Sequence, residues 1–277
     1  MKIKNQWHLN VPKILHVYWS MTVLPYIHFK TVDSFIRLNP DWEVWLWYSK
    51  TPGPVNTWPV AGEERKTYII PCTDYLEKLK KLPVKLREID VSEYGLDNGI
   101  AEVHKSDFFR YIILNSFGGV WSDMDILYFK PITNLLVNNY TNTSKDTFVC
   151  ISSYGHSIGF LMSCANNVFF NILAALAKRD YRPNTYQCIG TRMLDHYFPN
   201  MEAVDRISPA ANIGMESVYT YNAYNQLAII NDKIPKFSAG SIGCHWYGGH
   251  RMWEKFIQDT DGGLINLPNN IMGNLLK

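Results

Sequence analysis

The sequence is organised around one stretch, Gly118-Gly119-Val120-Trp121-Ser122-Asp123-Met124-Asp125. Ahead of it, residues 98–117 are the strongest helix candidate in the chain, with Asn98 as a candidate N-cap and the glycine pair as the stop. The apolar run 120–129 then predicts a buried strand. Alternate side chains of a strand point to the same face, so we expect the carboxylates of Asp123 and Asp125 to lie close together.

Two neighbouring carboxylates in such a setting need a compensating partner. At a separation of ~6 Å and an effective dielectric constant of ~20 they repel by roughly 3 kcal/mol. Exposure to water, a shared proton or a bound cation would offset this cost. Oxygen ligands with open positions suit Mn²⁺ or Mg²⁺, which also bridge the oxygens of a diphosphate. An Asp-x-Asp pattern alone is short and common by chance, and the alternative is a pair of surface acids on an edge strand.

The segments before this stretch predict an α/β fold. The run 13–19 is rich in β-formers, a helix is expected over residues 27–38 ending at Asn39-Pro40, and residues 43–48 read as a second strand. This order is typical of a parallel α/β unit. Further elements are expected as helices at 73–82, 164–179 and 187–198, as strands at 147–152 and 204–208, and as a loop at 51–62.

Composition limits the classes of partner and compartment. The 277 residues, 47% of them hydrophobic, can fill a sizeable core, and 27 basic against 25 acidic residues leave a net charge of +2 with no electrostatic reason to expect nucleic acid. Five cysteines without a C-x-x-C pair indicate reduced thiols. Because no signal peptide or membrane span is visible, we expect a cytoplasmic protein, in which sequons at Asn139 and Asn142 have no role.

One local charge run stands out. Lys78, Lys80, Lys81, Lys85 and Arg87 form the most basic stretch of the chain. It could give a weak association with an anionic membrane surface or with an acidic acceptor. A solvated helix face is the favoured interpretation.

The helix candidate ahead of the Asp-x-Asp segment carries a second charged pair. Val103, Asp107, Arg110 and Leu114 fall on one stripe, so Asp107 and Arg110 interrupt an apolar face. Spacing alone leaves two alternatives open. The pair either ties the helix to its neighbours, or Asp107 accepts hydrogen bonds from sugar hydroxyls while Arg110 donates to sugar or phosphate oxygens.

Three segments together resemble a known family. They are Val11-Pro12-Lys13-Ile14-Leu15-His16-Val17-Tyr18-Trp19, Asn39-Pro40-Asp41-Trp42-Glu43-Val44-Trp45-Leu46-Trp47, and Ser106-Asp107-Phe108-Phe109-Arg110-Tyr111 running into the glycine pair and Asp123-Met124-Asp125. In this order they are similar to the DXD-containing sugar transferases of glycosyltransferase family 32, and more distantly to the large clostridial glucosylating toxins. The matching segments cover about the first half of the chain.

The resemblance implies a GT-A fold, a Rossmann-like α/β domain with a mostly parallel central sheet flanked by helices. It implies one catalytic domain over residues 1–277, with a nucleotide-sugar half at 1–131 and an acceptor-side half at 132–277. It also implies Mn²⁺ or Mg²⁺, a UDP- or GDP-sugar donor, a glycan or other hydroxyl acceptor, and retention of anomeric configuration.

Site residues follow by position within the resemblance. Trp19 corresponds to an aromatic residue that stacks on the nucleotide base, although a core tryptophan is the alternative among nine. Asp107 and Arg110 correspond to donor-sugar contacts, and Asp123 and Asp125 to the ribose and metal-binding pair. We therefore expect Asp107, Arg110 and Asp125 to be catalytic.

The second half of the chain matches less well. His245 in His245-Trp246-Tyr247-Gly248-Gly249-His250 is similar to a late histidine that can complete the metal site, and it is favoured over His250. Cys188-Ile189-Gly190-Thr191 lacks the proline of the corresponding family turn, so no role is carried onto it. Ser49 replaces a family aspartate, which removes any donor contact expected there.

Other classes of function remain as alternatives. A haloacid-dehalogenase-like phosphatase also places Asp-x-Asp at a strand end, but it requires Thr or Val two positions later, where this chain has Leu127. A non-catalytic carbohydrate-binding protein on a transferase scaffold is the second alternative. Five tyrosines could stack on sugars, although aromatic residues are more often core: Tyr154, Tyr219, Tyr221, Tyr224 and Tyr247.

Overall fold

The structure is a computed structural model that describes residues 9–20, 22–54, 71–97, 99–138, 144–222, 224–260 and 267–277. The sequons at Asn139 and Asn142, the proposed N-cap Asn98 and most of the loop expected at 51–62 lie outside these residues.

A seven-stranded sheet in the order β3-β2-β1-β4-β7-β6-β8 forms the centre of the molecule. The neighbours β3, β2, β1 and β4 run parallel, β7 is antiparallel to both β4 and β6, and β8 is parallel to β6. The strands are β1 (Ile14–Tyr18), β2 (Glu43–Ser49), β3 (Val84–Ile89), β4 (Gly119–Ser122), β6 (Thr147–Ser152), β7 (Gly155–Ser163) and β8 (Ala210–Asn212).

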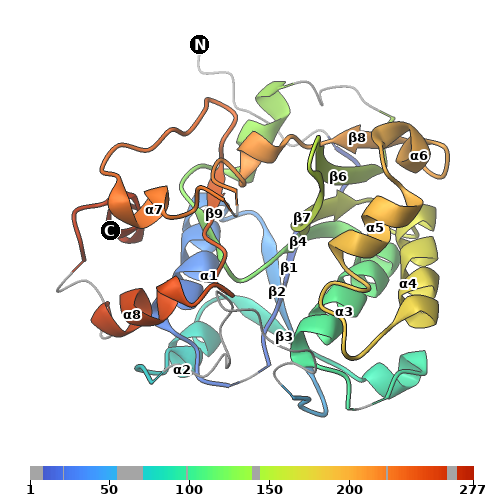
Figure 1. Cartoon of the computed structure of the whole chain (residues 1–277), viewed down its shortest axis with the longest axis horizontal. Coiled ribbons are helices and arrows are strands. Elements are labelled where there is room, and N and C mark those ends of the chain that lie inside the picture. The colour runs from blue at the N-terminus through green and yellow to red at the C-terminus, as the bar shows by residue number, and fades with distance from the viewer. Residues whose placement is uncertain are drawn as a thin grey trace.

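Helices cover the two faces of this sheet, and a small second sheet lies beside it (Figure 1). The second sheet pairs β5 (Ile126–Tyr128) with β9 (Gly243–His245). The helices are α1 (Tyr26–Leu38), α2 (Leu76–Lys80), α3 (Glu102–Phe117), α4 (Val168–Asp180), α5 (Thr191–Tyr197), α6 (Met201–Asp205), α7 (Ala228–Asn231), α8 (Met252–Asp259) and α9 (Ile271–Leu276), with 3₁₀ turns η1 (Val91–Tyr94), η2 (Ile132–Asn138) and η3 (Met215–Ser217). The predicted α/β fold, a mostly parallel sheet flanked by helices, is confirmed.

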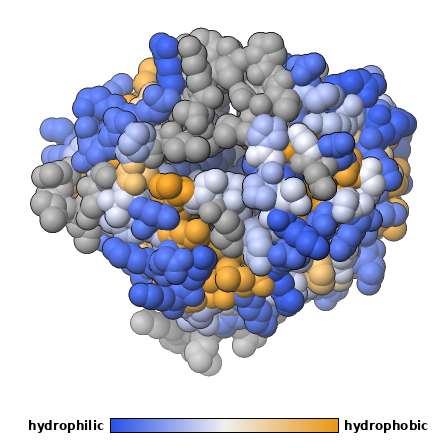
Figure 2. Space-filling model, turned by 90° about the horizontal axis from the view of Figure 1, so that it is seen from below, coloured by the Kyte–Doolittle hydropathy of each residue, from blue (hydrophilic) through white to orange (hydrophobic). Residues whose placement is uncertain are grey.

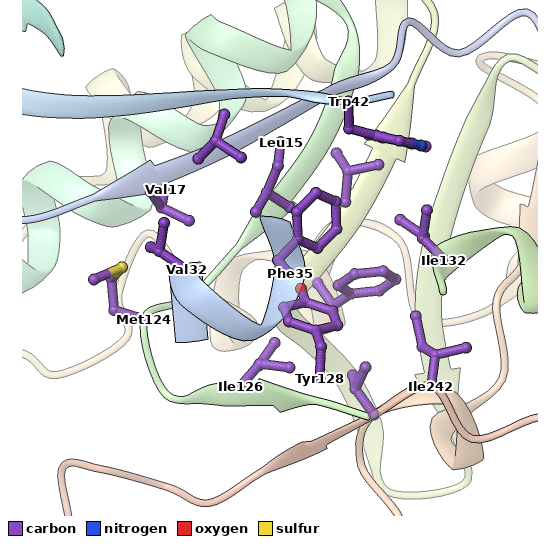
Figure 3. Close-up of a cluster of buried hydrophobic side chains, with 14 of the residues drawn as sticks. Leu15, Val17, Val32, Phe35, Trp42, Met124, Ile126, Tyr128, Ile132 and Ile242 are labelled. Carbon is purple, nitrogen blue, oxygen red and sulfur yellow. The ribbon is translucent and has the colours of Figure 1, made fainter. Parts of the chain in front are cut away.

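Strand alternation divides the core between the two faces. Leu15 and Val17 of β1 pack with Phe35 of α1 in one cluster, which also takes in Tyr128 of β5 (Figure 3). Trp121 of β4, the neighbour of Val120, points to the opposite face and packs there with the buried side of α3. A third cluster joins α8 and α9 to the residues around Trp246. Helices α1 and α3 therefore pack against opposite faces of the central sheet.

The glycine pair after α3 meets a steric requirement. Gly118 and Gly119 have φ angles of 62° and 93°, in the region that side chains disfavour. A Cβ atom would lie 2.5 Å from the backbone nitrogen of Ala165 at the first position, and 2.6 Å from the carbonyl oxygen of Ile14 at the second. The predicted stop of the helix at this pair is confirmed, and it lets the chain turn directly into β4.

The prediction of a single strand over 120–129 is wrong. The chain leaves the central sheet after Ser122, turns through Asp123, Met124 and Asp125, and re-enters a different sheet as β5. The two aspartates are therefore neighbours through a turn between sheets and not through strand alternation. Apolar residues on both sides hid the break, because each flank is buried in its own sheet.

Other expected elements have mixed outcomes. The strands at β1, β2 and β6 and the helices at α1, α2, α4 and α5 are confirmed, with shorter bounds for several of them. The strand expected at 204–208 is wrong, since α6 ends at Asp205 and β8 begins at Ala210. Helix α3 begins at Glu102, later than expected, behind Ala101. Strands β3 and β7 were missed, and α8, β9 and α9 give order to a tail with little periodicity.

The basic run is divided between two elements. Lys78 and Lys80 lie on α2, whereas Lys85 and Arg87 lie on the edge strand β3, so a single helix face is the wrong description. Figure 2 shows hydrophilic and hydrophobic residues interspersed on the face seen from below. Across the described residues, no helix combines the length and the apolar character needed to cross a membrane.

Candidate active site

Backbone hydrogen bonds from three parts of the fold hold the Asp123–Asp125 turn. Asp123 N donates to the carbonyl oxygen of Gly159 on β7 at 2.7 Å, and Thr31 Oγ1 of α1 donates to that of Met124 at 2.8 Å. Trp246 N, just after β9, donates to the carbonyl oxygen of Asp125 at 3.0 Å. Such anchoring fixes the backbone from which both carboxylates project before any ligand binds.

His245 joins the two aspartates at this turn. It is the last residue of β9, where it pairs with Ile126 of β5, so the small sheet brings the C-terminal part of the chain against the turn. One ligand atom from each of Asp123, Asp125 and His245 lies within 4.8 Å of the others. His250 is not part of this group and accepts a hydrogen bond from Met252 N through its Nδ1.

Asp125 divides its two oxygens between the fold and this site. Oδ2 accepts from Gly248 N at 2.7 Å. Oδ1 is buried and lies 3.1 Å from His245 Nε2, yet it accepts no aligned hydrogen bond within the described part of the chain. A carboxylate oxygen that has only an imidazole beside it, together with a second carboxylate, is a donor set that suits a divalent cation such as Mn²⁺.

The charges of this pair stabilise each other. Burial would raise the pKa of Asp125, but the charge of His245 and the Gly248 N–H outweigh burial and hold it at about 2. Burial would lower the pKa of His245, and the charges of Asp125 and Asp123 raise it instead. Asp125 is therefore ionised at neutral pH, the form a metal ligand requires.

Arg110 connects Asp107 on α3 to Asp123. Its guanidinium donates to Asp107 Oδ1 at 2.7 Å and to the carbonyl oxygen of Ile158 on β7 at 2.7 Å, and it lies 3.4 Å from Asp123 Oδ1. Asp107 and Arg110 are 4% and 3% exposed, so both interactions are largely withdrawn from water. Structural pairing and sugar contact, the two alternatives for this pair, are compatible, because the pair sits directly behind the turn.

Asp107 is held in an environment that disfavours its charge. Burial raises its pKa to about 6, Arg110 opposes that shift, and the negative charge of Asp123 adds to it. A Cβ atom at Gly190 would lie 3.0 Å from Asp107 Oδ2. The turn around Gly190, which carried no role in the sequence, thus lies against the second oxygen of this carboxylate.

Trp19 lies past the end of β1 and is part of an aromatic row. Its ring is 4.9 Å from that of His28 on α1, which in turn is 4.9 Å from Trp246. The charge of His28 also contributes to the low pKa of Asp125. Partly buried Trp19 is therefore linked through packed rings to the Asp123–Asp125 turn.

Ser49 and its surroundings show what replaces the family aspartate. Ser49 Oγ donates to the carbonyl oxygen of Thr51 at 2.8 Å and accepts from Lys105 Nζ at 3.2 Å. Lys105 is fully buried and also donates to Glu102 Oε1 at 2.9 Å. This position therefore serves the connection between β2 and α3.

Several residues of the site could not be recognised from the sequence, and others have a different place from the one predicted. Gly159 and Gly248 approach the aspartates closely, and the charge of His28 lowers the pKa of Asp125. Tyr219, a possible sugar-stacking residue, is instead buried at 5% exposure with its ring 5.0 Å from His245. Tyr221 is also buried, whereas Tyr154 and Tyr224 are 86% and 91% exposed. These placements depend on β7 and β9, which a single sequence did not reveal.

Comparison with protein families gives a match over this same region. Residues 25–142 match a family model described as a glycosyltransferase sugar-binding region containing a DXD motif. The matched range includes Asp107, Arg110, Asp123 and Asp125, but not Trp19 or His245. The resemblance to DXD-containing sugar transferases is confirmed.

One curated relative and several solved structures are similar to the chain. "Inositol phosphoceramide mannosyltransferase 3" of Schizosaccharomyces pombe is 28% identical over 116 residues, which are 42% of this chain and 24% of that protein. The chain thus matches about a quarter of that relative's length.

Among solved structures, the PaToxG glycosyltransferase has a TM-score of 0.47 at 16% identity, covering 71% of this chain and 73% of that one. The galactosyltransferase LgtC, solved with donor and acceptor sugar analogues, has a TM-score of 0.41 at 8% identity, covering 84% and 87%.

Proposed function

We propose that this protein is a glycosyltransferase that moves a sugar from a nucleotide-diphosphate donor to a hydroxyl acceptor and depends on a divalent cation. The observation that carries the proposal is the convergence of Asp123 and Asp125 from a turn with His245 from a strand 120 residues later. The two aspartates also lie inside the match to a DXD sugar-binding region. The buried Asp125 Oδ1, which has only the imidazole of His245 beside it among the described residues, supports cation binding most directly.

In this proposal Asp125 and His245 hold the cation and Asp123 assists. A bound Mn²⁺ or Mg²⁺ would neutralise negative charge on the diphosphate. The Gly248 N–H holds Asp125 Oδ2 and so leaves Oδ1 directed at the site. His245 contributes its Nε2 atom, the ring nitrogen nearest to Asp125.

Asp107 and Arg110 orient the donor sugar. Arg110 is held by Asp107, Ile158 and Asp123, so little conformational freedom remains for it to lose on binding. Asp107 Oδ2, next to Gly190, accepts from a sugar hydroxyl while Oδ1 stays paired with Arg110. Trp19 stacks on the base, while the ring of His28 and a hydrogen bond from Trp19 Nε1 to the carbonyl oxygen of Thr22 hold its ring in place.

Transfer with retention of configuration fits the residues best as attack from the same face. The bond from the anomeric carbon to the diphosphate oxygen breaks, a bond to the acceptor oxygen forms on the same side, and the acceptor proton passes to the departing diphosphate. Each carboxylate of the site already has a part in this proposal, in cation binding or in sugar contact, so none is assigned as an enzyme nucleophile. Binding geometry and charge then supply most of the rate enhancement.

The donor and acceptor define the first test. A UDP- or GDP-sugar is expected, and the name of the fission yeast relative makes a mannosyl donor and a phosphorylated inositol lipid the first pair to try. A panel of nucleotide sugars should include one whose slow hydrolysis depends on Mn²⁺ or Mg²⁺. Absence of turnover together with saturable glycan binding would instead favour the non-catalytic carbohydrate-binding alternative. Hydrolysis of simple phosphate esters would favour the phosphatase.

A further inference from the structure

Tyr247 has an unusual backbone conformation for an aromatic residue. Its φ angle is 54°, in the left-handed region that glycine adopts freely and bulky side chains avoid. Gly248 and Gly249 follow directly, yet neither of them has a positive φ angle. A turn that only reversed the chain would be better served by glycine at position 247. Residues held in this region cluster at functional sites, where the surrounding contacts keep them in place.

The left-handed turn brings the backbone of the next residue to Asp125. Gly248 N donates to Asp125 Oδ2 at 2.7 Å. A Cβ atom at Gly248 would lie 3.2 Å from Asp125 Cβ and 2.8 Å from Trp246 Cη2, so the chain passes close to both side chains. Tyr247 thus lies between His245 and Gly248, two residues that contact the Asp125 carboxylate.

The ring of Tyr247 packs against the imidazole of His245. The two ring centroids are 4.2 Å apart and the ring planes meet at 81°, an edge-to-face contact. The ring of Tyr219 lies 5.0 Å from the same imidazole. The hydroxyl group of Tyr247 donates to the carbonyl oxygen of Tyr221 at 3.0 Å. The Tyr247 ring is therefore held through its backbone at one end and its hydroxyl group at the other.

The imidazole of His245 lacks the hydrogen bond that usually orients a metal ligand. A ligating histidine commonly donates its second ring nitrogen to a carboxylate, a carbonyl oxygen or water, which fixes the orientation of the ring. His245 Nδ1 is buried and forms no hydrogen bond within the described part of the chain. Its Nε2 lies 3.1 Å from Asp125 Oδ1. Aromatic packing is therefore left as the contact that sets the plane of this ring.

We propose that Tyr247 is a positioning residue for the cation site. Its ring sets the plane of the His245 imidazole so that Nε2 faces the cation, and its left-handed backbone directs the Gly248 N–H at Asp125 Oδ2. This assignment rests on the proposed function and adds a residue outside the matched region 25–142. Tyr247 acts through its neighbours and does not bind the cation, because its hydroxyl group is held by Tyr221.

The first test is the order of the His245 ring in the metal-free protein. Long-range ¹H–¹⁵N NMR spectra should show one narrow set of His245 ring signals, identified by their absence in His245→Gln. Tyr247→Leu removes the aromatic ring and should give broadened or multiple sets for His245, whereas Tyr247→Phe should retain one set. A single narrow set in Tyr247→Leu would refute the proposal.

The second test is the affinity for Mn²⁺, measured by calorimetric titration with Mn²⁺ alone and with Mn²⁺ in the presence of UDP or GDP. Tyr247→Leu should weaken Mn²⁺ binding at least about tenfold, the usual effect of losing a partner that orients a metal ligand. Tyr247→Phe keeps the ring and should recover most of that affinity.

Tyr197→Leu is the matched control for the loss of a ring. Tyr197 makes a similar edge-to-face contact with His196, with ring centroids 4.5 Å apart and planes at 79°, and its hydroxyl donates to Asp180. His196 is not part of the metal-ligand group, so Mn²⁺ affinity should stay unchanged. Tyr247→Gly is a second variant without the ring, and it keeps the turn because glycine adopts a φ angle of 54° without cost. Its Mn²⁺ affinity should fall as in Tyr247→Leu.

The outcomes separate this assignment from the proposed function. Equal Mn²⁺ affinity of the unmodified protein, Tyr247→Leu and Tyr247→Gly would overturn the role of Tyr247 and leave the proposed function standing. A loss in Tyr197→Leu as large as in Tyr247→Leu would overturn that role as well, since the effect would then not depend on His245. No Mn²⁺ binding by the unmodified protein, with or without nucleotide, would contradict both proposals.

Discussion

Individual side chains of this site have their hydrogen-bonding capacity divided between the fold and the ligand. Asp125 Oδ2 accepts a hydrogen bond from Gly248 N, and Asp107 Oδ1 accepts one from Arg110. In each carboxylate the second oxygen remains for chemistry. Paired charges hold the side chains of the site in place. Burying these charges costs desolvation free energy, which their pairing offsets.

Substitution of Arg110 tests whether its simultaneous contacts matter for activity. Arg110→Lys keeps the charge but cannot reproduce the simultaneous contacts to Asp107, Ile158 and Asp123. We expect donor hydrolysis to fall by about tenfold to a hundredfold, a loss of roughly 1.4 to 3 kcal/mol of transition-state stabilisation.

Arg179→Lys serves as its control, because that exposed arginine pairs with Asp180 and Tyr197 on the surface. Steady-state kinetics of both variants make the comparison. Equal activities would show that the fork geometry of Arg110 is dispensable.

His16 predicts a pH dependence of stability. Its Nε2 lies 2.8 Å from the carbonyl oxygen of Gly118, and its Nδ1 accepts from Trp47 Nε1 at 3.1 Å, so the neutral ring is fully satisfied. Burial is the main cause that lowers its pKa from 6.5 to about 4. The unfolded chain therefore binds a proton that the folded protein excludes between these two values.

Stability from His16 should thus be complete above pH 6.5 and be lost as the pH falls toward 4, by up to about 3 kcal/mol. Urea unfolding at several pH values should show this slope, and it should be shallower in His16→Gln. An NMR titration gives an independent check, since the His16 ring should stay neutral at pH 5. A ring that titrates near pH 6.5 in the folded protein would refute the prediction.

At the scale of elements, the sequence predicted those whose pattern is local. Strand β1, helix α1 and the Gly118-Gly119 stop each follow from a run of residues and its boundary. The break between β4 and β5 could not be predicted, because both flanks are apolar and only tertiary pairing shows that they belong to different sheets. Strand β7 was missed, although it supplies Gly159 and the Ile158 carbonyl to the site.

The site was predictable to the same extent. Asp107, Arg110, Asp123 and Asp125 carry a recognisable spacing, and His245 was named by resemblance. Residues that act through close backbone approach or burial, such as Gly159, have no sequence pattern of their own. Their roles follow only from which elements pack together.

Gly159 provides a test of how closely β7 must approach the turn. Gly159→Ala should lower metal-dependent donor hydrolysis by at least about tenfold, since its methyl group would meet Asp123 Oδ2 at 2.7 Å. Gly249→Ala is the matched control, because a Cβ atom there has no neighbour within 4 Å. Equal activity of the two variants would mean that the turn relaxes away from β7 without consequence.

The whole molecule brings distant parts of the chain to the carboxyl end of β4, in the middle of the central sheet. The Asp123–Asp125 turn lies between two sheets, α3 reaches it from one face, and β9 returns from the C-terminal region to add His245 (Figure 1). A ligand that binds all of these parts should stabilise the folded state as a unit.

Cation binding should therefore raise the melting temperature. At Mn²⁺ concentrations of about one hundred times the dissociation constant, the gain is about 2.7 kcal/mol, or several degrees for a chain of this size. His245→Gln should reduce that shift, whereas His250→Gln should retain it, because only His245 lies with the two aspartates. Differential scanning fluorimetry measures these shifts. Equal shifts in both variants would show that His245 does not bind the cation.

The most direct test of the account is turnover of the preferred sugar nucleotide by Asp125→Asn, measured across a Mn²⁺ titration and in chelator. The variant keeps the shape of the side chain but loses the charge that Oδ1 presents to the site. Asp259→Asn is the control, since Asp259 is exposed and paired only with Lys255. We predict that the unmodified protein and the control turn over donor only with Mn²⁺ and that Asp125→Asn stays at background throughout. Activity of Asp125→Asn in chelator equal to that of the unmodified protein in Mn²⁺ would contradict the assignment of this site.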